Sequence, residues 1–160
     1  MNTILVNKEM DGIPGFCGTF ACDMIPTITS NISLIINTDP SSKPGKHWIA
    51  VYTSINTFYF FDSFGRSIEQ FAEPFRSYMR QASAGFNVRT SSHNLQFILS
   101  DTCGYWCIFW IYCKFSGVKI LEFFSKDNFQ NEIILKDIMY YLTNKLPRSL
   151  LDHFKNANVI

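Results

Sequence analysis

The sequence lacks a marked excess of charge of either sign. Its 160 residues carry 14 Lys and Arg against 13 Asp and Glu, which gives a formal net charge of +1. A protein dedicated to nucleic acid usually carries a strong positive charge or a basic patch, so the composition argues against that class. Hydrophobic residues make up 47% of the chain and charged residues 17%. These fractions exclude an intrinsically disordered chain and a charge-laced coiled coil.

The sequence also lacks a hydrophobic run long enough to cross a membrane. Its most apolar stretch, residues 103–115, contains Lys114 and falls well short of the roughly 20 residues that a spanning helix needs. Residues 1–15 show no basic segment followed by an apolar run and a cleavage site, and the five cysteines cannot all pair. We therefore expect a protein that is not secreted and not bound to a membrane, with reduced thiols.

No internal repeat or low-complexity tract is present, and the length fits a single domain over residues 1–160. Apolar, β-branched and aromatic runs predict strands at residues 32–36, 48–53, 57–61, 87–90 and 95–99. Helical spacing predicts helices at residues 67–82, 103–115, 120–124, 129–146 and 150–154. The pattern indicates an α+β fold, with a central mixed, largely antiparallel β-sheet packed by helices.

The segments 48–53 and 57–61 are joined by a short Ser-Ile-Asn turn, which predicts an antiparallel hairpin. His47 directly precedes the first segment, and Asp62 directly follows the second. In an antiparallel pair these two ends lie side by side. The sequence therefore predicts an imidazole beside a carboxylate that can fix its tautomer. The other two histidines, His93 and His153, lie in polar surroundings, so His47 is the candidate general base.

Cys103 is the candidate nucleophile. Asp101 and Thr102 are suitable N-caps for the helix that begins there, and Gly117 is a C-terminal stop. A thiol at a helix N-terminus, next to an imidazolium, is stabilised as the thiolate that attacks a carbonyl. Gly104, which follows, leaves space for a substrate. Taken alone, a cysteine at the start of an apolar helix is more often an inert core residue.

The functional residue types occur in the order His, acid, Gln, Cys. His47-Trp48 is followed by Phe61-Asp62-Ser63-Phe64-Gly65, and Gln96 stands seven residues before Cys103-Gly104. This order and spacing resemble the adenovirus-type cysteine endopeptidases, which belong with the SUMO and ubiquitin-like-protein proteases, whereas papain-like enzymes have Cys first. The resemblance covers about residues 11–115, and the C-terminal third matches nothing that we recognise.

The resemblance implies a role for each matched residue. His47 is the general base, Asp62 orients it, Cys103 is the nucleophile, and the Gln96 amide forms the oxyanion hole with the Cys103 backbone N–H. The residues after Gln96 are apolar, Phe97-Ile98-Leu99, where the family resemblance implies a polar loop. No metal and no cofactor is expected.

The resemblance also implies a substrate class. The indole of Trp48 would cover a narrow channel to the nucleophile, which favours cleavage next to Gly in Gly-Gly or Gly-X-Gly sites of a protein or polyprotein. Such an enzyme would act as a monomer that matures viral proteins, in the host cytoplasm or nucleus or packaged in the virion. Adenovirus enzymes are activated by DNA and by a peptide that forms a disulfide. Residues 66–102 contain no cysteine, which argues against such a peptide disulfide, and the near-neutral net charge argues against activation by DNA. An activating peptide or DNA is therefore left unassigned.

Three alternatives compete with the interpretation as a cysteine endopeptidase. A protease that removes ubiquitin-like modifiers would share the chemistry, and a catalytically dead relative could serve as a binding module. A zinc site built from Cys17, Cys22, Cys103 and Cys107 is the chemical rival, but the ligand spacing is poor. Trp48 could also be an ordinary core residue.

Overall fold

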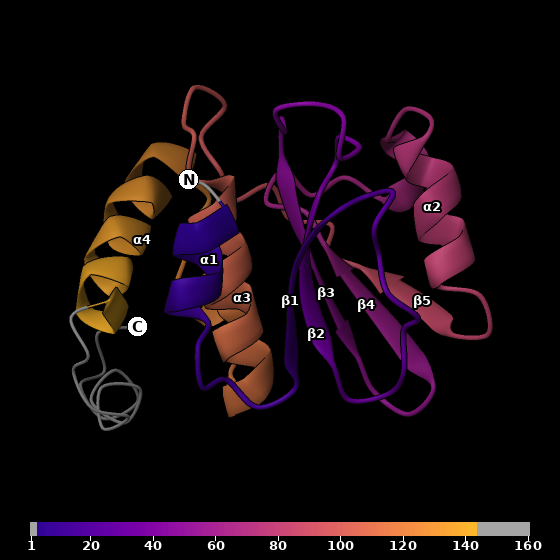
Figure 1. Ribbon diagram of the computed structural model, residues 1–160. Coiled ribbons are helices and arrows are strands. Elements are labelled where there is room, and N and C mark those ends of the chain that lie inside the picture. Colours follow the sequence, from indigo (N-terminus) through magenta and orange to yellow (C-terminus); the bar gives the residue numbers. More distant parts are fainter. Residues whose placement is uncertain (1–2, 144–160) are drawn as a thin grey trace.

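The computed structural model describes residues 3–143 (Figure 1). The strands are β1 (Phe16–Ala21), β2 (Ser33–Asn37), β3 (Trp48–Thr53), β4 (Thr57–Phe61) and β5 (Asn87–Thr90). The α-helices are α1 (Thr3–Glu9), α2 (Phe75–Ala82), α3 (Cys103–Ser116) and α4 (Asn128–Thr143), with short 3-10 turns η1 (Ile68–Gln70) and η2 (Ile120–Glu122). The predicted strands at 48–53, 57–61 and 87–90 are confirmed with the same bounds.

The strands form one mixed sheet in the order β1-β2-β3-β4-β5. The two inner pairings are antiparallel, and the two outer pairings, β1 with β2 and β4 with β5, are parallel. The predicted hairpin is β3 with β4, where Ala50 lies opposite Phe61. The α+β class with a mixed sheet is therefore confirmed, with its antiparallel part at the centre.

Helices cover both faces of the sheet, which makes three layers (Figure 1). Successive side chains of a strand point to opposite faces, and β2 shows this directly. Ile35 packs with α3, whereas Leu34 and Ile36 pack in a second core with α2. All five residues of β2 are buried. Because both faces of the strand are covered, its sequence has a continuous apolar run at the centre and no alternation of apolar and polar residues.

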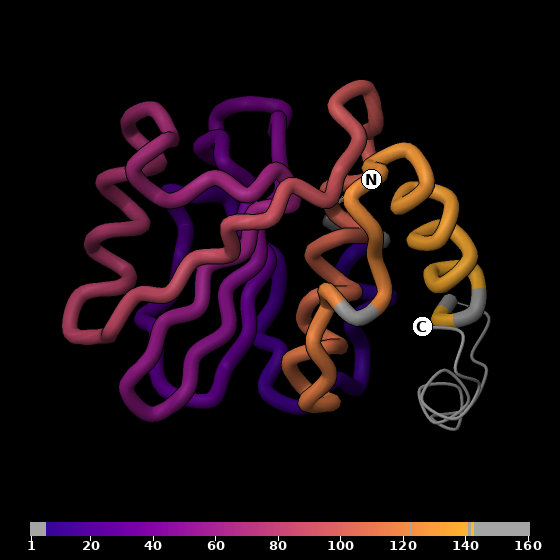
Figure 2. Tube along the Cα trace, turned by 180° about the vertical axis from the view of Figure 1, so that it is seen from behind, coloured from indigo at the N-terminus to yellow at the C-terminus, as the bar shows by residue number. Residues whose placement is uncertain are grey.

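Helix α3 lies between the sheet and the helices α1 and α4 (Figures 1 and 2). A helix that is apolar on all sides is stable in water only when it is covered on all sides. Trp106, Cys107 and Ile108 are fully buried, although they point in different directions around the helix. Gly117 ends the helix in the left-handed conformation with φ 70°, as predicted for a C-terminal stop. Among residues 3–143, no helix is both long and apolar enough to span a bilayer.

The strand predicted at residues 95–99 is wrong. Leu95 and Gln96 are buried, but both of their backbone N–H groups donate to the single carbonyl of Ser63. A strand needs a partner ladder, and here the backbone is satisfied by isolated contacts, while Ile98 and Leu99 are exposed.

Two of the predicted helices need correction or lie outside the described residues. The helix predicted at residues 67–82 is divided into η1 and α2, because Pro74 lacks the N–H that a continuous helix would use. No predicted element corresponds to α1 or β1. The helix predicted at residues 150–154 lies outside the described residues.

Candidate active site

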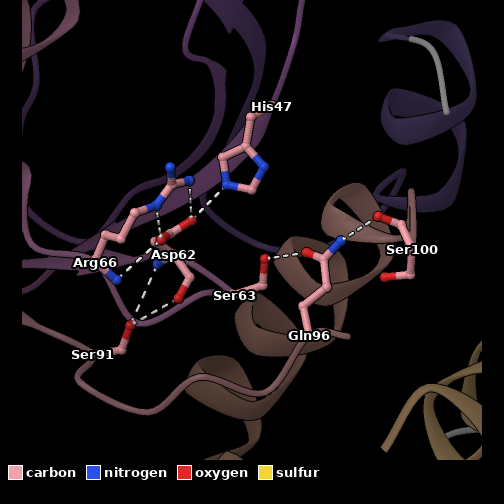
Figure 3. Close-up of polar contacts among 7 residues, drawn as sticks. All are labelled: His47, Asp62, Ser63, Arg66, Ser91, Gln96 and Ser100. Carbon is pink, nitrogen blue, oxygen red and sulfur yellow. Dashed lines mark hydrogen bonds and ion pairs between the residues drawn. The ribbon is translucent and has the colours of Figure 1, made fainter. Parts of the chain in front are cut away.

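His47 and Asp62 meet at one end of the β3–β4 hairpin. His47 lies just before β3, Asp62 lies just after β4, and the His47 Nε2 is 2.5 Å from the Asp62 Oδ1 (Figure 3). This contact confirms the predicted approach of imidazole and carboxylate. Because Nε2 faces the carboxylate, Nδ1 is the ring nitrogen left for a reacting group. The ring also stacks on Phe64, with centroids 5.4 Å apart.

A second cation, Arg66, holds the other side of the Asp62 carboxylate. The Arg66 Nε donates to Oδ2 at 2.8 Å, its Nη2 to Oδ1 at 3.2 Å, and its backbone N–H to Oδ2 at 3.0 Å (Figure 3). Burial raises the pKa of Asp62, but the hydrogen bonds and charges of His47 and Arg66 outweigh burial and lower it. Asp62 is therefore a fully buried carboxylate that stays ionised. The sequence analysis did not identify Arg66.

A glycine turn places Arg66 next to the carboxylate. The Gly65 N–H donates to the Asp62 carbonyl at 2.8 Å, and Gly65 has φ +73°. A side chain at this position would put its Cβ 2.8 Å from the carbonyl carbon of His93, so only glycine fits. The guanidinium of Arg66 then lies 4.3 Å from the ring centroid of Phe71.

Cys103 is the first residue of α3, and its surroundings favour the thiolate. Burial raises the pKa of Cys103, but the hydrogen bond and charge of His47 and the backbone N–H groups of Trp48 and Gly104 lower it overall. Burial lowers the pKa of His47, and its partners Asp62 and Cys103 raise it overall. Each member of the pair thus shifts toward the charged form.

Cys107 shows what happens to a thiol on the same helix without these partners. It is fully buried one turn after Cys103, and burial raises its pKa well above the ordinary value. The pKa values of two thiols that lie four residues apart in sequence are therefore shifted in opposite directions. The contact with His47 and the position at the helix start account for the difference.

Gln96 is a buried amide held at both ends. Its Oε1 accepts a hydrogen bond from the Ser63 Oγ at 2.5 Å, and its Nε2 donates to the Ser100 carbonyl at 3.0 Å (Figure 3). Ser63 directly follows Asp62, so the same turn fixes the carboxylate and the amide. An amide carries two N–H hydrogens, and within the described part of the chain Ser100 engages one of them. No acceptor for the second hydrogen is found among the described residues.

A groove of about 420 Å³ opens beside His47, and Phe64, Arg66, Lys43 and Lys46 are among its lining residues. Trp48 is half buried and packs against the core that contains α3, and its backbone N–H helps to lower the pKa of Cys103. Gly104 is buried in the first turn of α3. The two candidate substrate-binding residues therefore border the thiol.

The structure does not assemble the rival zinc site. Cys22 belongs to the core on the α2 face of the sheet, whereas Cys107 belongs to the core on the α3 face. Across residues 3–143, no group of three or more His, Cys, Asp or Glu side chains could hold a metal ion. His93 is exposed, and His153 lies outside the described residues.

Comparison with known proteins shows the family to which the chain belongs. The adenovirus endoprotease family matches residues 16–153. The chain is 28% identical over 164 residues to a protease of bovine adenovirus 4, covering 91% of this chain and 75% of that protein. It is 28% identical over 113 residues to a protease of bovine adenovirus 7, covering 62% of this chain and 55% of that protein.

A solved structure shows a weaker likeness. The crystal structure of the ASFV pS273R protease matches with a TM-score of 0.44 and 21% identity, over 69% of this chain and 43% of that chain. The family match covers most of the sequence and extends well past residue 115, where the resemblance recognised from motifs ended. The protein therefore belongs to the adenovirus endoprotease family of viral proteases.

Proposed function

We propose that this protein is a cysteine endopeptidase in which Cys103 is the nucleophile, His47 the proton carrier and Asp62 its orienting group. One observation carries the proposal: His47 links a fully buried, ionised carboxylate to a thiol whose pKa it lowers. A structural histidine would need neither the second cation on Asp62 nor a cysteine at a helix start.

The chemistry follows the usual two stages of acyl transfer. The Cys103 sulfur attacks the scissile carbonyl carbon. The oxyanion that forms accepts one hydrogen bond from the Gln96 amide and one from the Cys103 backbone N–H. His47 then gives its proton to the leaving amine as the C–N bond breaks, which leaves a thioester. In the second stage His47 takes a proton from water, the hydroxide displaces Cys103, and the new carboxyl end departs.

We further propose that the scissile bond lies next to Gly, in Gly-Gly or Gly-X-Gly sites of a viral protein or polyprotein. The support is the resemblance together with the place of Trp48 directly after His47, where its backbone N–H contributes to the lowered pKa of Cys103. A bulky indole beside the reacting carbonyl would leave little room for substrate side chains. A monomer acting in the host cytoplasm or nucleus, or inside the virion, fits this role. Removal of ubiquitin-like modifiers is the alternative within the same chemistry.

Cysteine variants test the proposal. Cys103→Ala should abolish cleavage of a peptide library, whereas Cys107→Ala and Cys113→Ala should keep cleavage and lose only stability. Comparable cleavage by Cys103→Ala would refute the assignment. A side-by-side assay of short peptides and modifier fusions separates the two substrate classes, because a modifier protease grips a whole folded partner.

A further inference from the structure

One buried carboxylate outside the described triad contacts the segment that carries both proposed oxyanion donors. Glu132 lies on α4, 5% exposed, and accepts four hydrogen bonds. Its donors are the Phe97 N–H at 3.0 Å, the Ser100 Oγ at 2.8 Å, the Thr102 Oγ1 at 2.6 Å and the Trp106 Nε1 at 3.2 Å. A buried carboxylate with this many donors is a firmly placed group.

The four donors fall into two sets. Phe97 and Ser100 belong to the loop that follows Gln96, whereas Thr102 and Trp106 lie at the start of α3, on either side of Cys103. Glu132 therefore joins the loop to the helix. It also reaches the Gln96 amide indirectly, because the Ser100 carbonyl accepts one Nε2 hydrogen of Gln96 while the Ser100 hydroxyl binds Glu132.

Two neighbours on α4 bind the same loop. The Asn131 side chain donates to the Leu95 carbonyl at 3.5 Å, and the Asn128 side chain donates to the Gln96 carbonyl at 3.4 Å. Figure 2 shows α4 beside the segment that leads into α3. The loop has no strand partner among the described residues, so its shape depends on these contacts with α4 together with those of Ser63.

We propose that Glu132 is a positioning residue that fixes the oxyanion loop, residues 96–102, against the start of α3. The inference rests on the proposed function, since it takes the Gln96 amide and the Cys103 N–H as the oxyanion donors. Glu132 touches no reacting atom. It acts by holding the two donors, which come from different parts of the chain, at a fixed separation before the oxyanion forms.

This role predicts a specific kinetic signature. Glu132→Ala should lower kcat by about 10²-fold, close to the loss of one oxyanion donor, with KM changed by less than about twofold. The Cys103 thiol should keep its reactivity toward iodoacetamide, because His47, the Trp48 N–H and the Gly104 N–H set it. Glu132→Gln should restore most of kcat, since its oxygen can accept as before and the Thr102 hydroxyl can rotate to accept from its NH₂.

A stability-matched control separates positioning from general weakening of α4. Leu135 is fully buried on the same helix, so Leu135→Ala should destabilise α4 while leaving kcat within about twofold of the unmodified protein. Equal kcat losses in Glu132→Ala and Leu135→Ala at equal loss of unfolding stability would overturn the proposal, as would an effect of Glu132→Ala on KM alone. If Glu132→Ala does not fold, Ser100→Ala removes one of the four hydrogen bonds to Glu132 and should lower kcat severalfold.

Hydrogen exchange supplies a readout that does not depend on proteolysis. Amide exchange across residues 96–103 should accelerate in Glu132→Ala and stay unchanged in Leu135→Ala. Unchanged exchange in Glu132→Ala would refute the positioning contact even in an active enzyme. Failure of the proposed function would instead show as full cleavage by Cys103→Ala, whatever the exchange result.

Discussion

Arg66 offers the sharpest test of the electrostatics around the proposed orienting carboxylate. Arg66→Leu removes two charge-assisted hydrogen bonds to a fully buried Asp62 and leaves the His47 contact and one backbone N–H. Hydrogen bonds to charged groups contribute about 1.5 to 3 kcal/mol. The Arg66 side chain is 37% exposed, and solvent screening therefore reduces the expected loss to about 1 to 2 kcal/mol.

The pH dependence of this loss has a definite sign. The folded protein lowers the pKa of Asp62, so ionised Asp62 stabilises the fold above its unfolded pKa of about 3.9. That contribution disappears as the pH falls through the folded pKa. Without Arg66 the folded pKa of Asp62 rises, so the stability difference between the two proteins should be constant near neutral pH and shrink on acidification.

Urea unfolding at a series of pH values measures both effects. Arg66→Lys should recover part of the loss, because it keeps the charge but not the planar fork. Arg76→Leu is the matched control: its partner Glu73 is exposed, so the change should leave the free energy of unfolding nearly unchanged. If the stability difference for Arg66→Leu grows as the pH falls, or equals the Arg76→Leu value, Arg66 does not stabilise the ionised Asp62 carboxylate.

Three further predictions concern the site directly. His47→Ala should reduce kcat as severely as loss of Cys103, and Asp62→Asn should reduce it less; full activity in Asp62→Asn would make Asp62 merely structural. Gln96→Ala should lower kcat by roughly 10²- to 10³-fold with little change in KM, as expected for one oxyanion donor, and an effect confined to KM would contradict that role. Trp48→Ala should relax the preference for Gly in library profiling while Cys103 stays reactive toward small alkylating agents; equal tolerance of bulky residues in the unmodified enzyme would show that Trp48 does not restrict the channel.

The parts of the site that the sequence predicted depend on local geometry. A hairpin with a short turn brings its two ends together wherever it occurs, and this is why His47 and Asp62 could be paired. The start of α3 was marked by a polar residue before a long apolar run, which placed Cys103 at a helix N-terminus. Both inferences used only neighbours along the chain.

The parts that the sequence did not predict depend on contacts between distant segments. Residues 95–99 resemble a strand by composition, but their backbone partners are Ser63 and Glu132, which lie more than thirty residues away in either direction. A single glutamate on a helix gives no local signal of burial. Arg66 was visible in the sequence, yet only the turn at Gly65 shows that it folds back onto Asp62.

Alkylation measures whether His47 holds Cys103 as a reactive thiolate. The rate of Cys103 modification by iodoacetamide is followed against pH, with the modified residue located by mass spectrometry and the exposed Cys17 as an internal reference. We expect Cys103 to react with a midpoint below the ordinary thiol value of about 8.5, and His47→Ala to move the midpoint upward. A midpoint at or above 8.5 in the unmodified protein, or one that His47→Ala leaves in place, would contradict this expectation.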